Sequence, residues 1–208
     1  PGVIGLEIGQ ALHRLGVKVH IFGLGGFLGG ISDPVVLEEA KKVFGEELTM
    51  NLDAQSEVKL DAEGNVEVHW QEGSESGVFT AEYMLAAVGR RPNVDKLGLE
   101  NLSIELDERG VPKADRLTMQ TSIAHIFIAG DASNQLPLLH EASDQGKIAG
   151  ENAGAYPNIS KGLRRSTIGV VFTSPQIATI GMRFSQVEAR YKSMECVAIG
   201  EVSFHNQG

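Results

Sequence analysis

Residues 1–22, PGVIGLEIGQALHRLGVKVHIF, decide the fold, because they predict a glycine turn, a helix and a strand in that order. The helix is expected over Leu6–Leu15, and Gly16 follows it where glycine commonly ends a helix in the left-handed conformation. Apolar residues that mark one helix face are Leu6, Ala11, Leu12 and Leu15. Val17–Phe22 predicts a buried strand, so the segment would complete a βαβ unit with a strand before Pro1.

Asp33 and Pro34 predict the start of a second helix, which extends to about Thr49. An aspartate side chain can accept hydrogen bonds from the first helical amides, and proline fits the first helical position. The side chains expected to face inward are Val36, Ala40 and Val43.

An antiparallel meander is expected after this helix. Glu57–Asp61 and Val66–Gln71 flank the turn residues Glu63-Gly64-Asn65, which is the pattern of a β-hairpin. Another strand is expected near Val78–Thr80, after a turn at Gly73–Gly77.

The character of the sequence changes after residue 93. The apolar run Tyr83–Val88 stops at Gly89-Arg90-Arg91-Pro92-Asn93, and short strands and a helix over about Leu138–Ala153 follow. After Pro157 the alternation of apolar residues is typical of a separate α+β piece, including an extended stretch at Val197–Phe204. The sequence thus predicts an α/β fold class.

Composition excludes several classes of protein. Of the 208 residues, 42% are hydrophobic, yet no apolar stretch approaches the ~18 residues that a membrane-spanning helix needs. The formal net charge of −9 argues against a nucleic-acid-binding protein, which needs a basic face. A single cysteine, Cys196, cannot form an internal disulfide, and no basic-plus-apolar leader opens the chain. These features predict a cytoplasmic protein whose partners are neither nucleic acid nor membrane.

Gly2 and Gly5 have the spacing of a dinucleotide-binding turn. One glycine lets the backbone approach a pyrophosphate, and the other lets the helix pack closely on a strand. The amides at Ile4–Leu6 would then face the phosphates at the positive end of the helix dipole. The alternative is a glycine-rich turn between strand and helix that binds no ligand.

An acidic residue about 20 positions further on normally binds the adenosine ribose in such a fold. That position falls on Gly23, which has no side chain to serve as an acceptor. No arginine or lysine lies between Lys18 and Lys41 to bind a 2′-phosphate. The sequence therefore gives no support for NADP and only weakened support for NAD.

A second candidate site lies at Ile126–Ala132, a predicted buried strand that ends in Gly130-Asp131. A carboxylate at the carboxyl end of a strand can accept two sugar hydroxyls, and glycine permits close approach. His140 begins the next helix, whose positive end could face an electron-rich ring edge. The alternatives are that Asp131 caps a turn and that His140 is a solvated surface residue.

Taken in order, these motifs resemble the pyridine nucleotide–disulfide oxidoreductases, most closely the dihydrolipoamide dehydrogenases. The resemblance covers essentially the whole chain. The motifs that carry it are Gly2-Val3-Ile4-Gly5-Leu6-Glu7, Leu15-Gly16, Ala87-Val88-Gly89-Arg90-Arg91-Pro92-Asn93, Ile128-Ala129-Gly130-Asp131 and Phe172-Thr173-Ser174-Pro175-Gln176-Ile177-Ala178-Thr179-Ile180-Gly181.

The resemblance implies three parts: a Rossmann-like NAD-binding domain with an inserted meander over 1–93, a return segment of an FAD domain over 94–156, and the first part of an α+β dimerisation domain over 157–208. It also implies FAD and NAD as cofactors and a homodimeric parent protein. Hydride equivalents would pass from a dithiol, either a small molecule or a lipoyl domain, through a Cys-x4-Cys disulfide to FAD and then to NAD⁺.

The resemblance also assigns residues to these cofactors. It implies that Glu7 lies beside the nicotinamide and flavin, and that Gly89 borders the NAD site. The pyrophosphate turn would comprise Gly2, Val3, Ile4 and Gly5. The residues toward the flavin would be Gly130 and Asp131 at the ribityl chain and Leu139 and His140 at the pyrimidine edge. The alternatives are a solvated glutamate for Glu7 and a charged loop for Arg90 and Arg91.

No catalytic residue and no metal ligand of the family is expected in this chain. The redox cysteine pair would lie before Pro1 and the His-x4-Glu base beyond Gly208, so the chain is expected to be an inactive fragment. Cys196 is interpreted as a small core residue, and His205 as part of an earlier strand rather than the base. The chain is expected to bind NAD(H) weakly and to retain no flavin.

Two alternatives stay open at this point. One is a flavoenzyme similar to soluble transhydrogenases or mercuric reductases, which share the nucleotide-binding folds. The other is a stand-alone nucleotide-binding module without catalysis.

Overall fold

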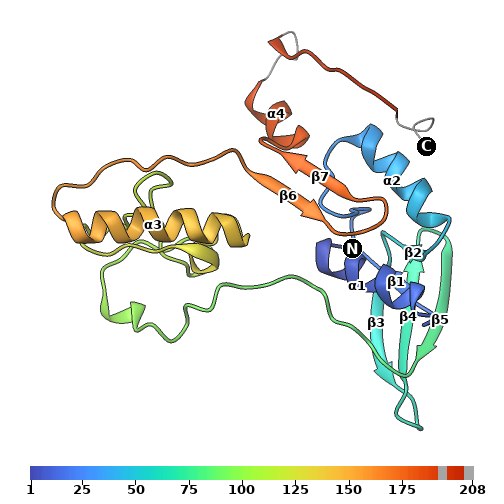
Figure 1. Cartoon of the computed structure of the whole chain (residues 1–208). Helices are drawn as coiled ribbons and strands as arrows, with labels where there is room; N and C mark the ends of the chain where they lie inside the picture. Colours follow the sequence, from blue (N-terminus) through green and yellow to red (C-terminus); the bar gives the residue numbers. More distant parts are fainter. Residues whose placement is uncertain (192–195, 204–208) are drawn as a thin grey trace. The chain divides into compact units, whose positions relative to one another are not determined.

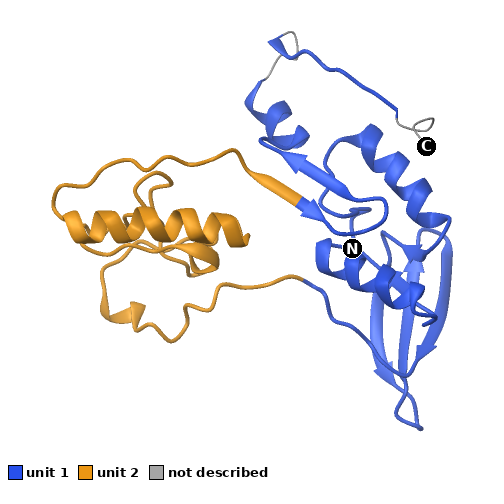
Figure 2. Cartoon of the chain, viewed as in Figure 1, with its two compact units in different colours: residues 1–88, 170–208 blue, residues 89–169 orange. Residues whose placement is uncertain are grey.

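A computed structural model describes residues 1–191 and 196–203 of the chain (Figure 1). The chain divides into two compact units (Figure 2). Unit 1 comprises Pro1–Val88 with Val170–Gly208, and unit 2 comprises Gly89–Gly169. The expectation for His205 lies outside the described residues.

Unit 1 begins with the predicted helix and strand. Helix α1 spans Val3–Arg14, and Gly16 follows it with φ +91°, the left-handed conformation that the sequence predicts. Strand β1 is limited to His20–Phe22 and pairs in parallel with β2, Thr49–Asn51. The expected α/β character is therefore confirmed, although the strand is shorter than predicted.

Asp33 caps helix α2, Pro34–Gly45, as predicted. Its Oδ1 accepts hydrogen bonds from the amides of Val35 at 2.9 Å and Val36 at 3.3 Å. The helix ends four residues before the predicted end, because Thr49 is already the first residue of β2.

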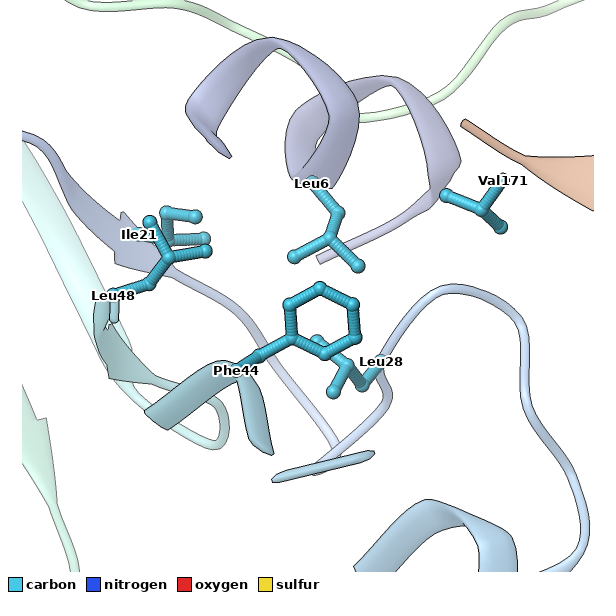
Figure 3. Packing of buried hydrophobic residues seen from close by; sticks show 6 residues of the cluster. All are labelled: Leu6, Ile21, Leu28, Phe44, Leu48 and Val171. Atoms are coloured by element: carbon cyan, nitrogen blue, oxygen red, sulfur yellow. The ribbon is translucent and has the colours of Figure 1, made fainter. Parts of the chain in front are cut away.

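The core of unit 1 confirms part of the predicted helix faces, because Leu6 is buried in it and Ala40 packs against it, and corrects the rest. It is formed by the buried side chains of Leu6, Ile21, Leu28, Phe44, Leu48 and Val171, several of which point toward one another in Figure 3. Leu15 of the predicted α1 face is 81% exposed, whereas polar Gln10 is buried. In α2, Val36 is exposed and Phe44 is buried instead. Gly9 explains the orientation of α1, because a Cβ there would lie 2.8 Å from Ile21 Cδ1.

The meander forms a three-stranded antiparallel sheet in the order β3-β4-β5. Its strands are β3 Gln55–Leu60, β4 Val66–Glu72 and β5 Glu75–Ala81. Gly64 lies in the first turn at φ +88°, which confirms the hairpin that the sequence predicts. The second turn is tighter than predicted, since β5 already begins at Glu75.

An aromatic cluster joins this sheet to β1. The rings of His20 and Phe22 stack at 4.2 Å, and Phe79 meets His20 edge-on at 4.9 Å. His20 Nε2 also lies 2.7 Å from Asn51 Oδ1, and Asn51 Nδ2 donates to Glu72 Oε2 at 2.6 Å. These contacts fix the carboxyl end of β2 against the meander.

Unit 2 has one long helix and little strand structure. Helix α3 spans Leu139–Ala155, close to the predicted range, and the short 3₁₀ helices are η1, Leu99–Asn101, and η2, Gly130–Ser133. The strand predicted at Ile126–Ala132 is wrong, because this half-buried stretch forms an isolated bridge between Gln120 and Phe127 instead of a regular strand.

The remaining elements are β6 Ile168–Val171, β7 Ile177–Ile180 and α4 Phe184–Arg190. Strands β6 and β7 form a two-stranded sheet, and Val171 contributes to the core of unit 1. Cys196 is exposed, so its interpretation as a core residue is wrong. Residues 196–203 form no strand that could cover it.

Candidate functional site

The N-terminus of α1 presents unused hydrogen-bond donors. Gly2 is the N-cap residue in an extended conformation, and no side chain of the described residues caps the helix. The first helical bond runs from the amide of Leu6 to the carbonyl of Gly2 at 3.1 Å, so the amides of Val3, Ile4 and Gly5 lie outside the helical ladder. Such amides, together with the helix dipole, favour an anion.

The two glycines of the turn have different surroundings. A Cβ on Gly2 would meet no atom of the described chain within 4 Å, so there is open space for a ligand to approach the backbone. A Cβ on Gly5 would lie 3.3 Å from Ala87 Cβ, so Gly5 permits close packing of α1 on the segment after the meander. This is the division of roles that a dinucleotide-binding turn requires.

Gly23 has a structural reason to lack the expected acidic side chain. A Cβ at this position would lie 2.8 Å from the backbone nitrogen of Pro1 and 3.1 Å from the carbonyl oxygen of Leu52. The carbonyl of Pro1 also accepts a hydrogen bond from the amide of Gly29 at 3.1 Å. The end of β1 and the turn before α1 therefore lie against each other, which brings two candidate parts of one nucleotide site together.

Glu7 and Gln10 bind the backbone of the segment between β6 and β7. Glu7 Oε1 accepts the amide of Phe172 at 2.8 Å. Gln10 Oε1 accepts the amide of Ser174 at 2.8 Å, and Gln10 Nε2 donates to the Ser174 carbonyl at 2.8 Å. Gln10 was not predicted as a functional residue, although its position one helical turn after Glu7 could have indicated a shared role.

The same side of α1 carries an ion pair with Glu47, which lies between α2 and β2. Arg14 Nε lies 2.5 Å from Glu47 Oε1, and Gln10 Nε2 donates to Glu47 Oε2 at 2.9 Å. The hydrogen bond from Arg14, with a smaller contribution from Gln10, lowers the pKa of Glu47 from 4.5 to about 2.

This pKa predicts how the stability of unit 1 depends on pH. A lowered folded-state pKa stabilises the fold above the unfolded value of 4.5, and this contribution is lost as pH falls toward 2. Arg14→Met should therefore flatten the fall in the free energy of unfolding between pH 5 and pH 2. Urea unfolding at each pH, followed by Trp70 fluorescence, would measure the free energy of unfolding. Lys41→Met is the control, because it removes a cation whose partner Glu38 is exposed to solvent. Equal pH dependence of the unfolding free energy in the two variants would contradict the account.

The second candidate site, in unit 2, centres on the turn at Gly130. Gly130 has φ +69°, and its amide donates to Gln145 Oε1 at 2.9 Å. The same oxygen accepts the hydroxyl of Ser133 at 2.9 Å, so buried Gln145 holds η2 in place. Asp131 is exposed and pairs with Arg90 Nη1 at 3.3 Å, a contact that the sequence analysis did not predict.

The start of α3 holds an unsatisfied buried nitrogen. His140 Nε2 is buried without a hydrogen-bond partner among the described residues, as is Gln145 Nε2. The helix has no side-chain cap within the described part of the chain, and Leu139 is 89% exposed. A buried polar group without a partner is costly, so His140 Nε2 marks a candidate contact for a polar group of a ligand.

The predicted residues thus fall into two groups. The turn and Glu7 lie on the first two turns of α1 in unit 1. The residues of unit 2 are Gly89, which has φ +102°, Gly130, Asp131, Leu139 and His140. Across the described residues, no group of three potential metal ligands comes together, and no helix is long and apolar enough to cross a membrane.

Comparison with known proteins identifies the family. The family model of the pyridine nucleotide-disulphide oxidoreductases matches residues 1–146, well over half of the chain. The chain belongs to this family. The resemblance inferred from the ordered motifs is therefore confirmed.

Among the relatives of this chain is the dihydrolipoyl dehydrogenase of Geobacillus stearothermophilus, 32% identical over 200 residues that cover 95% of the chain and 41% of that protein. A dihydrolipoyl dehydrogenase of Bacillus subtilis is 34% identical over 202 residues, with the same coverage of 95% and 41%. The structure of LpdA from Mycobacterium tuberculosis has a TM-score of 0.75 at 28% identity, covering 91% of this chain and 40% of that one. The chain thus spans about 40% of the length of these relatives.

Proposed function

We propose that the chain is the nucleotide-binding side of a flavin-dependent disulfide oxidoreductase of the dihydrolipoyl dehydrogenase type. The observation that carries this proposal is the uncapped N-terminus of α1 with open space at Gly2. The amides of Val3, Ile4 and Gly5 would donate hydrogen bonds to the pyrophosphate of NAD(H). Gly2 would let the backbone approach this pyrophosphate closely. NAD, when bound, exchanges a hydride at its nicotinamide ring.

Glu7 would position the neighbouring segment in this arrangement. Its carboxylate accepts the Phe172 amide, so α1 and the segment after β6 are held together beside the turn. This supports a role for Glu7 near the nicotinamide and flavin, as the family resemblance implies. The residue would act by fixing the backbone of this segment beside the turn.

Unit 2 would contribute to the FAD site. Asp131 offers an exposed carboxylate for ribityl hydroxyls, and Arg90 Nη1, 3.3 Å away, would help to orient it. The unpartnered Nε2 of His140 and the uncapped start of α3 fit a ligand edge that carries hydrogen-bond acceptors. Gly130 lets the backbone turn at φ +69° immediately before Asp131.

The parent protein would be a cytoplasmic homodimer that oxidises a dithiol, carried by a small molecule or a lipoyl domain, with FAD and NAD. Its domains would divide this chain at 1–93, 94–156 and 157–208. The catalytic cysteine pair and base would come from other parts of that protein. The chain by itself would then show no turnover of dihydrolipoamide.

A calorimetric titration of the chain with NADH tests this proposal. We expect saturable binding with a Kd weaker than about 1 μM, which corresponds to roughly −8 kcal/mol. ADP-ribose should compete because it keeps the pyrophosphate, whereas adenosine, which lacks it, should compete much more weakly. Absence of NADH binding at millimolar concentration would refute the proposed nucleotide site.

A further inference from the structure

The carboxyl end of β2 continues beside the loop after β1. The amide of Gly23 donates to the carbonyl of Asn51 at 2.7 Å, and the amide of Ala54 donates to the carbonyl of Gly23 at 2.8 Å. The amide of Gly26 donates to the carbonyl of Leu52 at 3.0 Å. Residues 52–54 are therefore held along the loop where the family pattern would place an acidic residue.

Asp53 brings a carboxylate to this loop. Its Oδ1 accepts the amide of Gly25 at 2.7 Å, and its own amide donates to Glu72 Oε1 at 2.6 Å. The residue is exposed, and no described residue binds its Oδ2. The side chain is thus anchored through one oxygen, while the other is available to a ligand.

The surroundings of Asp53 disfavour an additional phosphate. Asp53 lines an open groove of about 830 Å³ together with Gly26 and Leu52. The charged residues of the groove are Lys41, Glu46, Glu47, Asp53 and Glu72. Four carboxylates and one lysine line the groove. Glu47 is already paired with Arg14, and the lysine already lies 2.8 Å from Glu38, so the remaining carboxylates have no cation among the described residues of the groove left to balance them. A ligand with hydroxyl donors suits this groove better than one with a further anionic group.

We propose that Asp53 accepts the adenosine ribose hydroxyls of NAD(H), in the place that Gly23 leaves without a side chain, and that it excludes the 2′-phosphate of NADP(H). This inference rests on the proposed function. The preference for NAD then has a positive cause, because a carboxylate attracts hydroxyl donors and repels a phosphate. It also shows how a glycine at position 23 is compatible with a nucleotide site.

The geometry explains why the acceptor comes from the neighbouring strand. Gly23 must remain a glycine because its Cβ would contact the backbone of Pro1 and Leu52. Asp53 follows the parallel partner strand, and the carboxyl ends of parallel strands lie at one edge of a sheet. The bond to Gly25 fixes the carboxylate toward this edge before any ligand binds.

The test is a titration of the full chain and of Asp53→Asn with NADH, 2′-deoxy-NADH and NADPH. Asparagine keeps an oxygen that can accept from Gly25, so the loop should be preserved. We expect the variant to bind NADH roughly tenfold more weakly, as for a lost hydrogen bond to a charged group. The ratio of its NADH affinity to its NADPH affinity should fall at least tenfold below that of the unmodified chain. Removal of the 2′-hydroxyl should weaken binding to the unmodified chain and not to the variant.

Glu46→Gln is the matched control, since it removes one charge from the same groove without touching the loop. It should leave the ratio of NADH to NADPH affinity within about twofold of the unmodified chain. If the unmodified chain binds NADH and Asp53→Asn changes neither affinity nor ratio, the role of Asp53 is refuted and the nucleotide site stands. If the unmodified chain binds no NADH, the proposed function itself fails.

Discussion

Gly2→Asp should weaken NADH binding at least tenfold while making unit 1 slightly more stable. Gly2 is the N-cap residue of α1 with an extended backbone, which any residue can adopt, and a Cβ there meets no atom of the described chain within 4 Å. Aspartate is a better N-cap than glycine by a few tenths of a kcal/mol, with about 0.3–1 kcal/mol more from its charge at the helix dipole. Its carboxylate would occupy the amides that the pyrophosphate needs and would repel it.

Urea unfolding and an NADH titration of the same sample would measure both effects. We expect at least a tenfold loss of affinity without any loss of stability. Gly2→Asn is the matched control, because it caps the helix equally well but carries no charge. It should weaken NADH binding less than aspartate does. Undiminished NADH binding by Gly2→Asp would mean that the nucleotide does not use this helix end.

Arg164→Met should destabilise unit 2 by about 3–5 kcal/mol, because it leaves a buried carboxylate without its partner. Arg164 Nη2 pairs with Glu141, whose side chain is only 4% exposed. Arg164 Nη1 also donates to Gln135 Oε1 at 3.0 Å and to the carbonyl of Arg116 at 3.1 Å. One guanidinium thus joins α3 to two other segments of the unit.

Hydrogen exchange of the α3 amides would measure this loss in unit 2 alone. Arg165→Met is the matched control, since Arg165 pairs with Asp144 at 2.7 Å but is itself 68% exposed. Arg165→Met should lower the stability of unit 2 by less than about 1 kcal/mol. The double variant Arg164→Met with Glu141→Leu should recover most of the stability, because it also removes the buried carboxylate that has lost its partner. Equal protection in the two single variants would contradict this account.

Local signals in the sequence were sufficient to predict the two helices and the hairpin of unit 1. Gly16 after α1, Asp33 before α2 and Gly64 in the hairpin each have a chemistry that acts on neighbouring residues. The order of the motifs was likewise sufficient for the family, which the family match over residues 1–146 confirms. These features depend on short segments of chain, so they can be predicted without knowing the tertiary contacts.

The buried faces and the polar contacts could not be predicted, because their partners are distant in sequence. Gln10 is buried since it binds Ser174, 164 positions away, whereas apolar Leu15 is exposed. Arg90 meets Asp131 through the fold of unit 2. Asp53 reaches Gly25 only because β1 and β2 pair in parallel in one register. Periodicity alone carries no information on such pairings.

The measurement that tests the central claim most directly is a map of backbone amide shifts in the ¹⁵N-labelled chain during an NADH titration. If the N-terminus of α1 holds the pyrophosphate, the largest shifts will fall on Val3, Ile4 and Gly5 and on residues 23–26, with a shared saturation curve. The amides of Gly130 and His140 in unit 2 will then stay unchanged. Saturable shifts confined to unit 2, or none at millimolar NADH, would contradict the claim that α1 forms the nucleotide site.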